Sequence, residues 1–355
     1  MKLSIQLVTW NGAAYIPYLF DSLRKQNFFD WKLSILDNAS QDNTVERIKH
    51  ELSSVSIPFE FIENKVNEGF AGGHNRLFKK NCSEYVLLLN QDMYLGPDCL
   101  QRMLAYLETH AEISAVSPRL MRWDFRLLEN ADSKAGIDQE LLKRSFTDQI
   151  DALGLKIFRS RRVVEQYTRQ NWSEIRHMFV GNNVLVFGLS GAFPLYRCSD
   201  LKESLYANGS LFDESYHAYK EDVDLAYRLL SAGKSSLVLL DIFAYHDRSG
   251  AGPREMEDME AAKNKRLQSE WVRYHSYKNH LMTLYKNEYG FNFLLDFFWI
   301  LWYELKKFFW LLIFDRKVLK GFSEIFRERG ALQEKRKYIK AKRRLSWRNL
   351  RPWWL

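Results

Sequence analysis

The chain has 355 residues, of which 46% are hydrophobic and 27% charged. This composition excludes a disordered protein and leaves room for one large or two medium domains. The three cysteines are widely spaced and form no CxxC pair, which argues against a disulfide framework or a zinc site and fits a reducing compartment. An apolar run begins at once, without a signal-peptide pattern, so we expect a cytoplasmic protein.

The net charge of +8 is unevenly distributed along the chain. Residues 263–355 contain 22 Lys and Arg against 8 Asp and Glu, whereas residues 1–262 contain 30 against 36. Seven of the eleven tryptophans also lie after residue 270. This asymmetry predicts a catalytic or binding domain over 1–262, with halves of about 1–120 and 121–262, and a second region over 263–355 that meets an anionic surface.

Short apolar runs alternate with helical patterns through the first 120 residues. Strands are expected at 3–9, 32–37, 59–64, 85–90 and 113–120, and helices near 13–26, 42–54, 71–80 and 97–110. This alternation indicates βαβ units, and therefore an α/β fold with a mixed, mostly parallel sheet and flanking helices.

The pattern is irregular from 121 to 190 and becomes readable again beyond it. Strand-like material is expected at 184–188, 191–197 and 236–247, a helix at 221–234, and a long helix from about 255 to 288. The helix at 221–234 is acidic in its first turn, where the helix dipole favours acids, and ends at Gly233.

Polar residues follow four of the expected strands, at the point where each strand ends. Because ligands bind beyond the carboxyl ends of strands in such sheets, all four clusters should share one functional edge. The clusters are Thr9–Trp10–Asn11, Asp37–Asn38, Asn64–Asn67 and Asn90–Gln91–Asp92.

The stretch NEGFAGGHN, residues 67–75, contains Gly69, Gly72 and Gly73 just before a helix. Glycines allow the backbone to approach a ligand closely and leave N–H groups for an anion. The stretch is neither GxGxxG nor a GK[ST] loop. A tight strand-to-helix turn without a ligand is equally compatible with it.

Three acidic residues could carry chemistry. A single acid such as Asp92 at this functional edge suffices to begin an Mg²⁺ or Mn²⁺ site that phosphate oxygens complete, although a turn or capping role is the ordinary one. Asp222 and Asp224 lie about 200° apart on a helix, so they cannot face the same cleft. Asp222, beside Glu221, is the better candidate for a general base, and Asp224 is expected to pair with Arg228.

His246 follows Asp222 by 24 residues and ends the next expected strand. An isolated histidine is usually a packing residue. Its place on the same edge as Asp92 also makes it a candidate ligand for Mn²⁺.

Together these segments resemble family 2 glycosyltransferases of the GT-A fold, in particular their rhamnosyltransferase-like bacterial branch. The matching segments are VTWNG (8–12), LDNASQDNT (36–44), NEGFAGGHN (67–75), LLLNQD (87–92), SGAFPLYR (190–197), FDESYHAYKEDVDLAYR (212–228) and His246. The resemblance covers residues 8–246 and is specific as a set, whereas no single motif is.

The resemblance implies roles for individual residues. Asp92, in NQD where the family has DxD, would bind Mn²⁺ or Mg²⁺ with His246, and Asp222, next to Glu221, would be the base. The nucleotide-sugar would be bound by Thr9, Asn11, Asp37, Asn38, Asn67, Gly69, Gly72, Gly73 and Asn90. His74 departs from the family pattern, where Asn is expected.

The segment 291–314 is strongly apolar, but Asp296, Glu304 and Lys307 interrupt it along one helix face. This pattern favours an amphipathic helix in the membrane interface over a membrane-spanning one, and a packed core helix is the alternative. Basic clusters and tryptophans then alternate over 334–355, which suits an anionic bilayer surface and, less well, single-stranded nucleic acid.

The resulting hypothesis is an inverting glycosyltransferase on the inner face of a bacterial membrane. It would move a sugar from dTDP-rhamnose, or from a UDP-sugar, to a lipid-linked saccharide in cell-surface polysaccharide synthesis, with no nucleic-acid partner. A sugar nucleotidyltransferase would need a glycine-rich, basic loop after the first strand, which VTWNG lacks. A catalytically inactive membrane scaffold remains an alternative, and the oligomeric state is left open.

Overall fold

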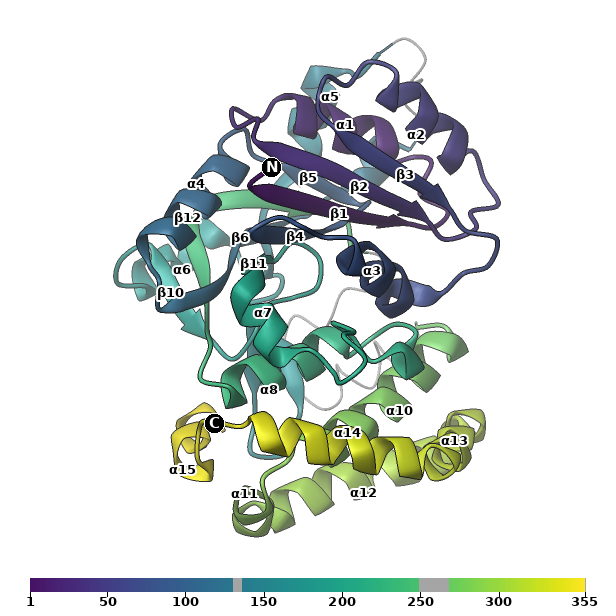
Figure 1. Cartoon of the computed structure of the whole chain (residues 1–355), viewed down its shortest axis with the longest axis vertical. Helices are drawn as coiled ribbons and strands as arrows, with labels where there is room; N and C mark the ends of the chain where they lie inside the picture. Colours follow the sequence, from purple (N-terminus) through teal and green to yellow (C-terminus); the bar gives the residue numbers. More distant parts are fainter. Residues whose placement is uncertain (130–135, 249–267, 355) are drawn as a thin grey trace.

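The computed structural model describes residues 1–129, 136–248 and 268–354 (Figure 1). The strands are β1 (Leu3–Thr9), β2 (Trp31–Asp37), β3 (Phe59–Glu63), β4 (Tyr85–Asn90), β5 (Met93–Leu95), β6 (Ile113–Trp123), β7 (Phe146–Ala152), β8 (Leu155–Ile157), β9 (Val163–Glu165), β10 (Asn183–Val186), β11 (Leu195–Arg197) and β12 (Ser235–His246).

Helices pack on both sides of the sheet and beneath it (Figure 1). They are α1 (Ile16–Arg24), α2 (Thr44–Leu52), α3 (Gly69–Lys79), α4 (Cys99–Thr109), α5 (Gln139–Ser145), α6 (Trp172–Ile175), α7 (Cys198–Ser204), α8 (Glu221–Ser231), α10 (Glu270–Asn287), α11 (Gly290–Leu295), α12 (Phe297–Phe314), α13 (Gly321–Arg327), α14 (Arg329–Lys342) and α15 (Trp347–Leu350). The part of the predicted long helix that precedes residue 268 lies outside the described residues.

The main sheet has the order β10-β12-β6-β11-β4-β1-β2-β3, with β5 added to β12 and β7 to β6. β1 pairs in parallel with β2 and β4, and β2 with β3. β11 is antiparallel to both β4 and β6. The predicted mixed, mostly parallel sheet is therefore confirmed.

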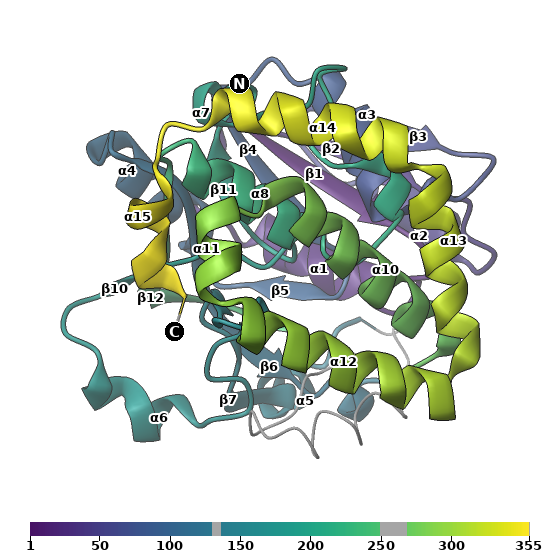
Figure 2. The same ribbon diagram turned by 90° about the horizontal axis from the view of Figure 1, so that it is seen from below.

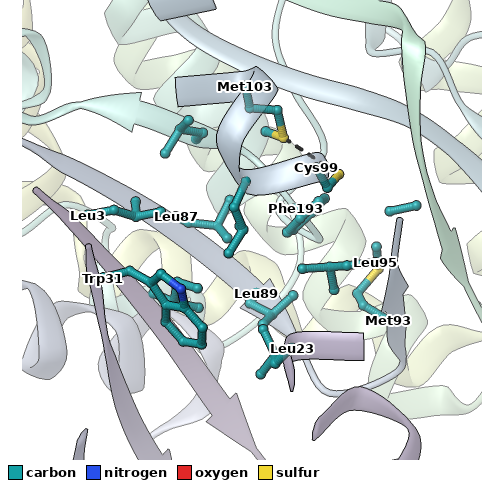
Figure 3. Close-up of a cluster of buried hydrophobic side chains, with 14 of the residues drawn as sticks. Leu3, Leu23, Trp31, Leu87, Leu89, Met93, Leu95, Cys99, Met103 and Phe193 are labelled. Carbon is teal, nitrogen blue, oxygen red and sulfur yellow. Dashed lines mark hydrogen bonds between the residues drawn. The ribbon is translucent and has the colours of Figure 1, made fainter. Parts of the chain in front are cut away.

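The sheet is held by a core of aliphatic side chains. Leu3, Leu87 and Leu89 of β1 and β4 face Cys99 and Met103 of α4 in a cluster of fully buried residues (Figure 3). β4 is apolar from Tyr85 to Leu89, as expected of a parallel strand covered on both faces, whereas β1 also carries the buried polar residues Ser4 and Gln6.

The region from 121 to 190, which the sequence leaves unassigned, adds strands to the sheet. β7 pairs antiparallel with the end of β6, and β8 and β9 form a separate hairpin. β5, a three-residue strand that sequence patterns do not predict, pairs with the end of β12. β5 and β7 therefore extend the main sheet at the ends of β12 and β6.

The C-terminal helices pack against the sheet domain from below (Figures 1 and 2). α10 contacts α8 and α14. Lys286 of α10 is fully buried and bonds the carboxylates of Asp213 and Asp224. A buried cation shared by two carboxylates ties α10 firmly to the segment around α8.

The segment 291–314 differs from the single helix expected. It breaks at Asp296 into α11 and α12, because the Asp296 side chain is fully buried and bonds Arg159, Arg161 and Arg351. The helix face that carries Asp296, Glu304 and Lys307 is turned toward the rest of the protein, since Glu304 bonds His280 at 2.7 Å.

The opposite face of these helices is apolar and exposed, the reverse of an ordinary surface helix. The large exposed hydrophobic residues here are Phe291, Phe293, Leu294, Leu295, Phe297, Phe298, Trp299, Leu301, Trp302, Leu305, Phe309, Leu312, Ile313 and Phe314, followed by Phe322 and Phe326 of α13. We call this set the apolar face. Within the described ranges, no helix is both long and apolar enough to cross a membrane.

Candidate active site

The site forms at the carboxyl ends of β1, β2 and β4. The parallel register places Thr9 beside Asp37 and Val8 beside Asn90. The order of strands reverses here, since β1 is followed in the sheet by β2 on one side and β4 on the other. Such a switch point is where open α/β sheets bind ligands, so the expectation that these clusters share one edge is confirmed.

Asp37 is buried and held by hydrogen bonds. Its carboxylate accepts from the Thr9 hydroxyl at 2.9 Å and from the Ser40 backbone N–H at 2.8 Å and hydroxyl at 2.6 Å. These donors fix its orientation at the end of β2. A carboxylate fixed at such a point can bind the hydroxyl or N–H groups of a nucleoside.

The loop after β1 is shaped by Gln91, a member of the polar cluster that follows β4. Its amide accepts from the Trp10 N–H at 2.9 Å and donates to the Trp10 carbonyl at 3.0 Å. A Cβ on Gly12 would lie 2.3 Å from the Gln91 side chain, so a larger residue there would displace the Gln91 amide from Trp10. Asn11 has a positive φ and accepts from the Gln41 N–H, which ties this loop to the one after β2.

Asn38 braces the glycine-rich stretch. Its amide donates to the Gly69 carbonyl at 2.9 Å and accepts from Asn64 and from the Glu68 N–H, both at 3.1 Å. Asn67 accepts from the Gly69 N–H at 2.8 Å. Both asparagines therefore have internal partners as well as their proposed contacts with the nucleotide-sugar.

The glycines at the start of α3 have a packing role. A Cβ on Gly73 would lie 2.9 Å from Val8 of β1, and one on Gly72 would lie 2.8 Å from the Glu68 Cβ. The helix can approach β1 this closely because Gly73 has no side chain. The approach brings the start of α3 to the edge of the sheet where β1 ends.

Asp92 and His246 lie side by side, although 154 positions separate them in the sequence. Their Oδ1 and Nε2 atoms are 3.3 Å apart, because β5 and β12 pair with His246 opposite Met93. The other ring nitrogen of His246 bonds Asp151 at 2.9 Å. Burial opposes a charged imidazolium, but the carboxylates of Asp92 and Asp151 raise the pKa of His246 well above its ordinary value.

This pair fits a divalent cation that is shared with a ligand. A carboxylate behind the second imidazole nitrogen is the usual orienting partner of a metal-binding histidine. Over residues 1–129, 136–248 and 268–354, no group of three or more His, Cys, Asp or Glu side chains could hold a metal by itself. Two protein donors plus diphosphate oxygens is the arrangement common for Mg²⁺ and Mn²⁺.

Asp222 and Glu221 begin α8, as the sequence predicts. The Asp222 carboxylate accepts from the backbone N–H groups of Gly191 at 3.3 Å and Val223 at 2.7 Å. Burial raises the pKa of Asp222. Burial and the charge of Asp222 raise the pKa of Glu221 to about 8, so Glu221 is protonated at neutral pH and Asp222 is the better base.

Short backbone links connect Asp222 to the end of β4. The Asn90 N–H donates to the Ala192 carbonyl at 3.0 Å, one residue from Gly191, whose N–H binds Asp222. The ring of Phe70, at the start of α3, lies 3.4 Å from where a Gly191 Cβ would stand. The glycine-rich stretch, the end of β4 and the start of α8 therefore meet around residue 191.

Asp224 points away from this site, as helical spacing predicts. It bonds Arg228 at 2.9 Å, which confirms the predicted pair. Lys286 and Tyr206 also bond it. Asp151 completes the site without a sequence signal of its own, because it acts through His246, which only the fold brings near.

Acids and a glycine-rich helix start thus lie at the switch point of a mostly parallel sheet, which is where open α/β folds bind ligands. The chain belongs to glycosyltransferase family 2: the model of the family described as "Glycosyl transferase family 2" matches residues 4–201, more than half of the sequence. The matched range contains Asp92 and the glycine-rich stretch. Asp222 and His246 lie beyond it.

Relatives and a solved structure agree with this assignment. The chain is 22% identical over 293 residues to the uncharacterized glycosyltransferase YfnE of Bacillus subtilis, covering 74% of this chain and 68% of that protein. It is 28% identical over 120 residues to the O-antigen chain rhamnosyltransferase RfbN of Salmonella typhimurium, covering 34% of this chain and 37% of that protein. It spans 44% of the putative glycosyltransferase EpsE of B. subtilis.

The fold is that of GT-A glycosyltransferases. A crystal structure of GalNAc-T7 with UDP, GalNAc and Mn²⁺ superposes with a TM-score of 0.54 at 11% identity, covering 81% of this chain and 48% of that one. At this level of identity the likeness concerns the fold alone.

Proposed function

We propose that this glycosyltransferase moves a sugar from a nucleotide diphosphate donor to an acceptor hydroxyl with inversion at the anomeric carbon. The observation that carries the proposal is that Asp92 and His246 lie side by side just beyond the end of β4, the strand end to which Asp222 is linked through Gly191 and Ala192. A diphosphate, a metal and a base are what such a transfer needs in one place.

The chemistry is one displacement. The Asp222 carboxylate takes the proton of the acceptor hydroxyl, whose oxygen attacks the anomeric carbon of the donor sugar. The bond to the nucleotide diphosphate breaks as the new glycosidic bond forms, and the configuration inverts. Because Glu221 is protonated at neutral pH, it adds no second negative charge where the acceptor oxygen becomes nucleophilic.

Asp92 and His246 would hold Mn²⁺ or Mg²⁺ together with the diphosphate. The cation would supply neutralisation of the charge on the leaving group. Asp37 and Thr9 would bind the nucleoside, with Asn11, Asn38, Asn67, Asn90 and the three glycines around it. Mn²⁺ in the GalNAc-T7 structure supports use of a divalent cation.

We favour dTDP-rhamnose as donor, and a UDP-sugar is the second candidate. The first rests on the similarity to RfbN, whose name gives a rhamnosyltransferase. The second is supported by the UDP bound in the GalNAc-T7 structure.

The test is turnover of the full chain with dTDP-rhamnose or UDP-GlcNAc, followed by NMR of the anomeric proton. Asp222→Asn should lower kcat by about 10²–10⁴-fold, the usual contribution of a general base, while nucleotide binding persists. Asp224→Asn is unsuitable as a control because it breaks a buried ion pair, so Asp241→Asn, an exposed acid, serves instead. Near-normal turnover of Asp222→Asn would end the base assignment.

The acceptor would enter beside Asp222. Tyr219, three residues before it, and Trp271 of α10 are both exposed, with ring centroids 5.8 Å apart. Exposed aromatic rings next to a base suit the apolar face of a sugar. We propose that the acceptor is a lipid-linked saccharide, as the apolar face defined above supports.

We propose that the apolar face docks on the inner surface of an anionic membrane. Exposed basic residues border it, namely Arg316, Lys317, Lys320, Arg327 and Arg329. Each basic residue near an anionic bilayer contributes on the order of 1 kcal/mol, and exposed Phe and Trp suit interfacial depth.

Co-sedimentation with phosphatidylcholine vesicles, with and without phosphatidylglycerol, tests the docking. Phe298 is 80% exposed on α12, and Phe29 is 69% exposed far from the apolar face. Phe298→Glu should weaken binding about tenfold or more, because burying a phenyl ring contributes about 1.5–3 kcal/mol, whereas Phe29→Glu should not. Equal binding by both variants, or a loss of self-association in Phe298→Glu with unchanged vesicle binding, would refute the membrane docking.

A further inference from the structure

The chain enters α8 through a turn with unusual backbone geometry. His217, Tyr219 and Lys220 have φ values of 59°, 72° and 71°, in the left-handed region that residues other than glycine rarely adopt. Such conformations cost on the order of 1–3 kcal/mol each and persist only where the surroundings fix them. The turn ends one residue before Glu221 and two before Asp222.

One side chain of α10, Asn279, bonds three backbone carbonyls of this turn. The Asn279 amide nitrogen lies 2.9 Å from the Tyr216 carbonyl, 2.9 Å from the Ala218 carbonyl and 2.7 Å from the Tyr219 carbonyl. Three acceptors around one NH₂ group determine which end of the amide faces the turn. Asn279 is fully buried, so water cannot replace these bonds.

The same turn touches the glycine-rich stretch. The His217 carbonyl accepts from the Ala71 N–H at 3.1 Å. A Cβ on Gly69 would lie 2.3 Å from the His217 carbonyl oxygen, so the turn and the start of α3 are in direct contact. The conformation of the turn therefore sets the spacing between Asp222 and the proposed diphosphate site.

We infer that Asn279 is a positioning residue for the transfer reaction: its amide locks the turn over residues 216–220 and thereby fixes the Asp222 carboxylate relative to the donor. The inference rests on the proposed function and deepens it. It makes α10, which lies beyond the expected catalytic domain of 1–262, a working part of the active site. Displacement of a reacting group by about 1 Å can cost about 100-fold in rate.

Asn287 provides a matched control. It is a second buried asparagine on α10, and its amide bonds the Asp224 carboxylate at 2.8 Å and the Thr283 carbonyl at 3.0 Å, not the turn. Both Asn279→Ala and Asn287→Ala remove a buried amide from the same helix. A role in stability alone would make the two variants behave alike.

The experiment compares both variants with the unchanged full chain, using release of nucleotide diphosphate from dTDP-rhamnose and UDP-GlcNAc with water as acceptor. Asn279→Ala should lower kcat about 10–100-fold and leave the KM for the donor within about threefold of its normal value. Asn287→Ala should keep kcat within about threefold, because it leaves the hydrogen bonds of the turn intact. If Asn279→Ala does not fold, Asn279→Ser, which keeps one donor, should show an intermediate loss.

Hydrogen exchange gives a readout that does not depend on activity. The backbone amides of residues 214–222 should exchange faster in Asn279→Ala, because this variant releases the turn. In Asn287→Ala their exchange rates should not change. Unaltered exchange and turnover in Asn279→Ala, or equal losses in both variants, would overturn the inference alone. Absence of turnover in the unchanged chain with both donors and an added saccharide acceptor would overturn the proposed function and, with it, the role of Asn279.

Discussion

Replacement of Asp296 by asparagine tests how α11 and α12 are fixed to the protein. Its buried carboxylate accepts from Arg161 at 2.9 Å and from Arg159 at 2.9 Å, and it also bonds Arg351. Asp296→Asn would leave the three cations with Glu288 as the remaining carboxylate of the cluster. Breaking a buried ion pair costs about 3–5 kcal/mol.

The expected value lies near the lower end of that range. Arg159 and Arg351 are partly exposed and can turn to water, whereas Arg161 is fully buried but keeps Glu288. A loss of about 3 kcal/mol, divided by an unfolding entropy of about 0.75 kcal/mol/K for 355 residues, lowers Tm by about 4 °C.

The assay is thermal unfolding by circular dichroism, with Asp241→Asn as the control. Asp241 pairs with Arg102 at the surface, so its loss should cost under about 1 kcal/mol. If Asp296→Asn and Asp241→Asn shift Tm equally, the cluster around Asp296 is not what holds these helices.

Two further predictions concern pH. His74 is fully buried without a hydrogen-bond partner, and burial lowers its pKa to about 3. Between pH 7 and pH 5 the folded chain therefore leaves His74 neutral, whereas the unfolded chain protonates it near pH 6.5. The free energy of unfolding should fall by about 2 kcal/mol over this range. Urea titrations should show this loss reduced in His74→Asn but not in His50→Asn, and an unchanged loss in His74→Asn would refute it. Burial raises the pKa of Asp222 and the charge of Lys220 partly offsets the rise, so Lys220→Gln should move the acid limb of the kcat–pH profile to higher pH. A limb that stays in place or moves lower would contradict this electrostatic role.

The first half of the sheet could be read from the sequence because its signals are local. β1 and β4 match their predicted ranges, and β12 is within one residue of its own. Buried parallel strands are continuous apolar runs, and Gly233, with a positive φ, ends the α8 pattern as expected. Parallel pairing of these strands then places the polar clusters that follow them on the same edge of the sheet.

The remaining features depend on contacts between distant residues. The sequence around Asp296 is equally compatible with a solvated carboxylate and with a buried one. The contacts with Arg159, Arg161 and Arg351, which are distant in the sequence, determine that it is buried. The clamp by Asn279 likewise depends on a helix that begins 48 residues after Asp222. The helical spacing of Asp296 shows only that it shares a face with Glu304 and Lys307, and Asn279 carries no periodic or capping pattern.

The proposed metal-dependent binding of a nucleotide is tested most directly by the Tm of the full chain with UDP, dTDP or GDP, each with Mn²⁺, Mg²⁺ or EDTA. A nucleotide at about 100 times its Kd adds about 2.7 kcal/mol, which is a rise of about 3–4 °C. We predict that at least one nucleotide gives this rise with metal, and that Asp92→Asn abolishes it. A rise that is the same in EDTA and in Asp92→Asn, or no rise with any nucleotide, would contradict the proposed site.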